Sequence, residues 1–140
     1  MLVLDTDHIS ILGEPSEAGL RLLRRLRDSN REAVTSVVTV EENLQGWLAA
    51  INCAKAEHQL IRAYVKFRQR VEFFADWFVL HWDEDSSCRF RELRKQGVRI
   101  GTHDLRIASI SLAHDSTILT RNTSDFAQVP GLKFENWLDD

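Results

Sequence analysis

Short apolar runs rich in β-branched residues alternate along the chain with longer segments of helical periodicity. Residues 2–4, 33–38 and 116–120 have the composition of buried strands, and residues 77–82 form a further strand-like run. Strands that alternate with helices build right-handed βαβ units. The pattern therefore predicts an α/β fold, with a central parallel sheet and helices on both of its faces.

The segments between these runs carry the spacing of helices. In one of them apolar residues recur every three or four positions, at Leu60, Tyr64, Phe67, Val71, Phe74 and Phe78. Residues 83–96 are predicted to form a helix that ends at Gly97, and residues 103–114 a helix that is apolar nearly all round. A helix of the latter kind packs against a sheet. The region 47–78 is interpreted as a helical hairpin packed on the same domain.

Composition points to one compact domain spanning residues 1–140. The chain is 44% hydrophobic and 28% charged, and it contains no repeat, low-complexity tract or Gly/Ser-rich linker. The apolar run before Asp5 is too short for a signal peptide or a membrane span. The two cysteines of the chain, Cys53 and Cys88, are expected to be buried thiols in a reducing compartment. These features favour a cytoplasmic protein.

The charge balance excludes a protein that binds nucleic acid through overall positive charge. The net charge is -3, with 21 acidic against 18 basic residues. Any polyanion must therefore be held by local clusters. Two predicted helical segments supply them: Arg21, Arg24, Arg25 and Arg27 in one, and Arg89, Arg91, Arg94, Lys95 and Arg99 in the other. For each cluster a solvated helix face is the simpler interpretation.

Four acidic residues follow a predicted strand or open a predicted helix: Asp5, Glu42, Asp104 and Asp125. Each also has a structural explanation. Asp5 and Asp125 are suited to capping a helix or turn, and Asp104 would favour the positive end of a helix dipole. Glu42 would end a Thr-x-x-Glu capping box that begins at Thr39.

Taken together, the four acids predict a metal site. In a parallel sheet the carboxyl ends of the strands meet at one edge, where ligand crevices form. Clustered carboxylates repel one another unless a cation or protons compensate them. Oxygen ligands of this kind suit Mg²⁺ or Mn²⁺. Zinc is not expected, because the five histidines and two cysteines show no ligand spacing.

Four blocks of the chain, residues 2–7, 39–46, 100–108 and 119–132, contain these acids in order. Together they resemble the PIN domain, and specifically the VapC-type ribonuclease toxins of bacterial toxin–antitoxin pairs. The resemblance runs essentially from end to end. It implies a PIN-like three-layer α/β/α sandwich with an added helical hairpin.

The resemblance also implies an activity. The protein would be an endoribonuclease that cleaves RNA phosphodiester bonds with Mg²⁺ or Mn²⁺, and its catalytic acids would be Asp5, Glu42, Asp104 and Asp125. The first three would hold the metal, while Thr6, Thr120 and Asn122 would support or orient its ligands. The implied partners are an RNA substrate, a cognate antitoxin and a second copy of the chain that packs through the hairpin; no membrane is involved.

Two assignments within the site stay open. Many PIN domains carry an acid where this chain has Asn122, and the nearest acid is Asp125, so either residue could complete the site. Glu41 adjoins Glu42, and only one of the two can face a crevice from a helix.

Two alternatives to a nuclease are also consistent with parts of the sequence. One is a PIN-like module that binds a partner protein or RNA without turnover. The other is an aspartyl-phosphate phosphatase, which the Asp-x-Asp motif at residues 5–7 would suit. Such enzymes also need a later Lys and an acid pair at a strand end. The only adjacent acids near the C-terminus end this chain, which disfavours that class.

Overall fold

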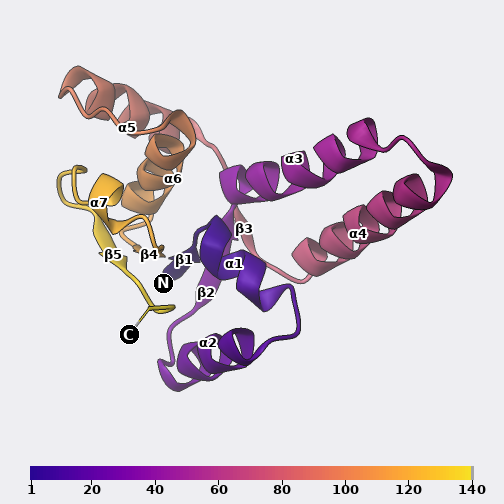
Figure 1. The fold of residues 1–140 in the computed structure, drawn as a ribbon. Coiled ribbons are helices and arrows are strands. Elements are labelled where there is room, and N and C mark those ends of the chain that lie inside the picture. Colours follow the sequence, from indigo (N-terminus) through magenta and orange to yellow (C-terminus); the bar gives the residue numbers. More distant parts are fainter. Residues whose placement is uncertain (140) are drawn as a thin grey trace.

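A five-stranded parallel sheet forms the centre of the structure, a computed structural model that describes residues 1–139 (Figure 1). In spatial order the strands are β3 (Val79–Leu80), β2 (Ala33–Ser36), β1 (Leu2–Leu4), β4 (Thr117–Leu119) and β5 (Lys133–Glu135). All neighbouring pairs are parallel. The predicted parallel α/β fold is confirmed. The short edge strand β5 was not expected from the sequence.

Helices connect these strands and cover the sheet. They are α1 (Thr6–Leu12), α2 (Glu17–Asp28), α3 (Val37–Cys53), α4 (Glu57–Ala75), α5 (Glu84–Lys95), α6 (Thr102–Ala113) and the single turn α7 (Thr123–Phe126). Helices α3 and α4 lie side by side as a hairpin that extends away from the sheet (Figure 1). The first arm of this hairpin begins at Val37, well before Trp47. The helix predicted to end at Gly97 is α5, and Gly97 has the positive φ of 83° that favours glycine after a helix.

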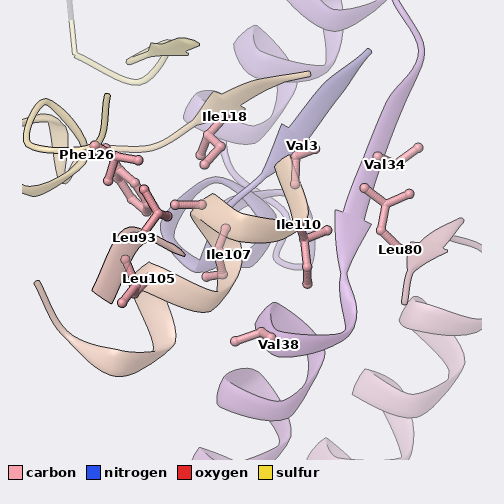
Figure 2. Packing of buried hydrophobic residues seen from close by; sticks show 12 residues of the cluster. Val3, Val34, Val38, Leu80, Leu93, Leu105, Ile107, Ile110, Ile118 and Phe126 are labelled. Atoms are coloured by element: carbon pink, nitrogen blue, oxygen red, sulfur yellow. The ribbon is translucent and has the colours of Figure 1, made fainter. Parts of the chain in front are cut away.

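The two faces of the sheet pack into two separate cores, as the alternation of side chains along β1 requires. Val3 points to one face, where it meets Ile118 of β4 and Ile107 and Ile110 of α6 (Figure 2). Leu2 and Leu4 point to the other face, against α1 and α2. Helices therefore lie on both sides of the sheet, which gives the three-layer α/β/α sandwich.

The apolar spacing in α4 predicts one apolar helix face, but most of that face is exposed. Phe74 is buried, whereas Leu60, Tyr64 and Val71 are all exposed to solvent. The hairpin extends beyond the sheet, so only the end of α4 near Phe74 reaches a core (Figure 1).

The expectation that both cysteines are buried is wrong, because Cys53 and Cys88 are exposed free thiols. Cys53 ends α3 at the far end of the hairpin, and Cys88 lies on α5. Within residues 1–139 no helix has both the length and the apolar character needed to cross a membrane.

Candidate functional site

The candidate site lies where β1 and β4 end side by side. From β1 the chain moves to β2 and β3 on one side of the sheet, while β4 and β5 lie on the other side. This reversal is the point at which crevices form in parallel sheets. Asp5 follows β1 and Thr120 follows β4, and the Thr120 hydroxyl donates a 2.9 Å hydrogen bond to Asp5 Oδ2.

Asp5 both caps α1 and belongs to the cluster of acids. Its Oδ1 accepts a 2.7 Å hydrogen bond from the Thr6 backbone N–H, while the Thr6 hydroxyl has no hydrogen-bond partner among the described residues. The Asp5 side chain is buried, with only 6% of the residue exposed. Burial, aided by the charges of Asp7 and Asp104, raises the pKa of Asp5 to about 7. The role of a helix cap alone does not require a buried carboxylate surrounded by other acids.

Glu42 lies inside α3 rather than at its start, so the capping-box explanation is wrong. The N-cap of α3 is Ser36, whose hydroxyl accepts the Thr39 backbone N–H at 3.1 Å. Glu42 is half-buried, and its Oε1 has no hydrogen-bond partner within the described chain. Burial and the charge of Asp104 raise the pKa of Glu42, although His103 opposes them.

Ser36→Ala is expected to lower the free energy of unfolding by about 1–2 kcal/mol, because Ser36 is fully buried and caps the helix that carries Glu42. Urea denaturation would measure the loss. Ser87→Ala is the control, since Ser87 lies within α5 and accepts only a long 3.5 Å contact from Arg91. An unchanged stability for Ser36→Ala would contradict the role given to this cap.

Asn122 joins the other two acids. Its Nδ2 donates hydrogen bonds to Asp104 Oδ2 at 2.8 Å and to Asp125 Oδ2 at 3.0 Å. Asp104 lies in the first turn of α6 and Asp125 in the single turn α7. Burial and the charges of Asp125 and Asp7 raise the pKa of Asp104, while the bond from Asn122 lowers it. The structure thus brings both Asn122 and Asp125 to Asp104.

Asp7 is a further acid of the cluster and was not among the predicted site residues. It accepts hydrogen bonds from His8 Nδ1 at 2.7 Å and from the Arg121 backbone N–H at 2.9 Å. Burial raises the pKa of Asp7, but these hydrogen bonds outweigh it and the pKa is lowered. Asp7 therefore ionises more readily than Asp5, Glu42 or Asp104 when no metal is bound. Its place in the Asp-x-Asp motif was the available signal.

The two neighbouring glutamates of α3 differ in their surroundings. Glu41 is exposed, and its Oε1 lies 3.3 Å from His103 Nε2. Glu42 is the half-buried member, and the charges that act on it are those of Asp104 and Asp7 as well as Glu41. The electrostatic neighbourhood of Glu42 is therefore that of the acid cluster.

The cluster fits a hard divalent cation by its donor chemistry rather than by preformed geometry. Within residues 1–139 no three His, Cys, Asp or Glu side chains converge closely enough to enclose an ion. However, Asp5, Glu42 and Asp104 all have raised pKa values, and a buried Glu42 oxygen lacks a hydrogen-bond partner. A cation would satisfy this oxygen and balance the charge.

Comparison with known proteins supports a specific family. No family model matches the chain. Ribonuclease VapC2 of Rickettsia felis is 29% identical over 121 residues, which cover 82% of this chain and 81% of that protein. Ribonuclease VapC1 of Haemophilus influenzae strain R2866 is 28% identical over 110 residues, or 77% and 76% of the two chains.

Solved structures give the same fold. VapBC2 from Rickettsia felis, bound to a DNA fragment from its promoter, aligns with a TM-score of 0.73 at 20% identity over 97% of this chain and 98% of that chain. VapBC-1 from nontypeable Haemophilus influenzae aligns with a TM-score of 0.70 at 23% identity over 99% and 98%. The fold and the acidic edge of the sheet define a PIN-like protein. In sequence the chain is similar to proteins named Ribonuclease VapC over about four fifths of its length.

Proposed function

We propose that the protein is a metal-dependent endoribonuclease, the toxin of a toxin–antitoxin pair. The observation that carries the proposal is the cluster of one buried and two half-buried acids with raised pKa values at the carboxyl edge of the sheet. Sequence relatives named Ribonuclease VapC supply the RNA substrate class. Residues 1–140 would form a single PIN-like domain.

In this proposal Asp5, Glu42 and Asp104 would hold Mg²⁺ or Mn²⁺. When bound there, the ion would stabilise charge on the phosphate and lower the pKa of the attacking water. Asp5 is oriented for this task from both sides, because the Thr6 backbone N–H and the Thr120 hydroxyl each hold one of its oxygens. Fixed ligands of this kind lose little conformational freedom when substrate binds.

Asn122 orients the opposite side of the site. Its amide group holds Asp104 and Asp125 at the same time, which keeps two mutually repelling carboxylates in place. Asp125 is then positioned to orient a water molecule or a ligand. This arrangement gives separate roles to Asn122 and Asp125.

The proposal includes two protein partners. The solved relatives are VapBC complexes, so we infer an antitoxin partner for this chain as well. A second copy of the chain would pack against the exposed apolar residues of the hairpin, which are Leu48, Leu60, Ile61, Tyr64, Val65 and Val71. A monomeric mass at high concentration would contradict this dimer.

The direct test is cleavage of a mixed RNA panel by purified protein in Mg²⁺, in Mn²⁺ and in chelator. We expect cleavage with either metal, none in chelator, and none by Asp104→Asn, because this change weakens the proposed metal site. Asp115→Asn, prepared identically, is the control, since Asp115 is an exposed acid paired with Lys133. It should cleave like the wild type.

Each control tests a different part of the proposal. Equal cleavage by Asp104→Asn and the wild type would point to a contaminating nuclease and contradict the assignment of Asp104. Cleavage that survives chelation would contradict the metal. No cleavage under any condition would favour a module that binds RNA or protein without turnover.

A further inference from the structure

We propose that a cavity beside the acid cluster binds a base of the RNA strand, next to the phosphate that is cleaved, with Trp82 as its stacking surface. This inference rests on the proposed ribonuclease function. The cavity has a volume of about 660 Å³ and is lined chiefly by Val37, Glu41, Trp82, Ser87, Phe90 and Arg106. Its size lies within the range of small-ligand sites.

The cavity adjoins the site through a contact between α3 and α6. Glu41 of α3 lines the cavity, and its Oε1 lies 3.3 Å from Nε2 of His103 at the start of α6. The charge of His103 lowers the pKa values of both Glu42 and Asp104, so His103 lies beside these two acids. Helices α3 and α6 also contact each other directly. A strand that places a phosphate at the acids therefore brings a neighbouring nucleotide to the cavity.

The aromatic residues of the cavity are held in a fixed arrangement. Trp82 and Phe90 meet edge to face, with ring centroids 5.6 Å apart and an interplanar angle of 80°. The guanidinium groups of Arg94 and Arg106 lie over the Phe90 ring, at 4.7 and 6.0 Å from its centroid. Trp82 remains 38% exposed. An exposed indole supported in this way presents a surface on which a base can stack.

The charges around the cavity favour RNA over an apolar partner. Arg94 and Arg106 have no carboxylate partner within residues 1–139, so they are available to phosphate groups. A purely apolar surface would instead have to desolvate Arg106 without compensation. Glu41 can accept a hydrogen bond from the amino group of a base, as acidic side chains do with cytosine. The cavity thus combines stacking, phosphate attraction and a possible base-selective acceptor.

The experiment uses a short single-stranded RNA that the wild type cleaves at one bond, and a series in which each neighbouring nucleotide in turn is made abasic. For Trp82→Ala we expect KM to rise by about 5- to 100-fold, the usual cost of losing a stacked base, with kcat nearly unchanged. Trp82→Phe should recover most of the loss. Phe78→Ala is the matched control, because Phe78 is an exposed aromatic residue at the opposite end of β3.

The abasic series tests contact with a particular base. The wild type should lose affinity when one specific nucleotide is abasic, whereas Trp82→Ala should be insensitive to that change, since both remove the same interaction. Independent, additive losses would overturn the proposal. So would a Trp82→Ala protein that loses its dimer without any position-specific effect, because this face would then be a protein interface. If the wild type cleaves RNA and Trp82→Ala matches it, only this inference fails; if the wild type cleaves no RNA, the proposed function fails with it.

Discussion

Replacing Asp5 by Asn is expected to abolish RNA cleavage and, at the same time, to make the metal-free protein more stable at pH 8. Cleavage should fall by at least about 10²-fold, the loss that follows removal of one group that stabilises charge in a transition state. The gain in stability arises because Asp5 is buried among other acids, and its pKa is raised from 3.8 to about 7. An ionised Asp5 therefore costs free energy in the folded state.

The direction of the pH dependence follows from linkage. Below pH 4 Asp5 is protonated in both the folded and the unfolded chain, and the substitution should change little. Between pH 4 and 7 the unfolded chain has lost this proton while the folded protein keeps it, so the contribution of protonated Asp5 to stability falls as pH rises through about 7. The shift corresponds to at most about 4 kcal/mol. Because Asn disturbs the bonds from Thr6 and Thr120, we expect a net gain of roughly 1–3 kcal/mol at pH 8.

Urea denaturation in chelator at pH 4.5 and pH 8 would measure this gain. Asp7→Asn is an informative control, because Asp7 lies two positions away but has a lowered pKa. Its replacement should destabilise the protein at pH 8. An Asp5→Asn protein that is less stable than the wild type at pH 8 would show that Asp5 serves mainly as the N-cap of α1.

The positions of the acids were predictable because they depend on topology. Apolar patterning predicts the buried strand at residues 2–4. The rule that parallel strands end at one edge of the sheet then places the acid that follows it. The burial of helix α6 was predictable in the same way, because its sequence is apolar on nearly all sides. Chain order and apolar patterning are therefore enough to predict that Asp5 and Asp104 lie at the same edge of the sheet.

Features set by long-range contacts were not predictable. The Thr-x-x-Glu pattern at Thr39 indicated a helix start, yet the preceding Ser36 caps α3, because α3 begins directly after β2. The apolar spacing of α4 did not reveal that this helix extends past the sheet and exposes Tyr64. Two of the three residues of β5 are exposed, so the strand lacks the apolar pattern that predicts a buried strand. It can be recognised only from its pairing with β4. The exposure of α4 and the pairing of β5 depend on how distant segments are placed, which no local pattern records.

Replacing Asn122 by Asp is expected to destabilise the metal-free protein, because Asn122 donates hydrogen bonds to two acids. Asn122→Asp would replace the shared donor with a third carboxylate between Asp104 and Asp125. Two hydrogen bonds to charged groups would be lost and repulsion added, so we expect the metal-free protein to lose about 2–4 kcal/mol at pH 8. Added Mg²⁺ should stabilise Asn122→Asp more than it stabilises the wild type, because the extra acid strengthens the attraction for a cation.

Thermal unfolding in chelator and in Mg²⁺ separates these two effects. Asn136→Asp is a matched control, since Asn136 also donates to an acid, Asp139, but in an exposed position where solvent weakens the repulsion. Equal losses for the two variants in chelator would mean that any Asn-to-Asp change of this kind is costly and that the cluster at Asn122 is not special. A loss confined to Asn122→Asp and reversed by Mg²⁺ would indicate that Asn122 holds mutually repelling acids in place while the metal is absent. The same amide would then explain how this chain keeps its site folded without an acid at that position.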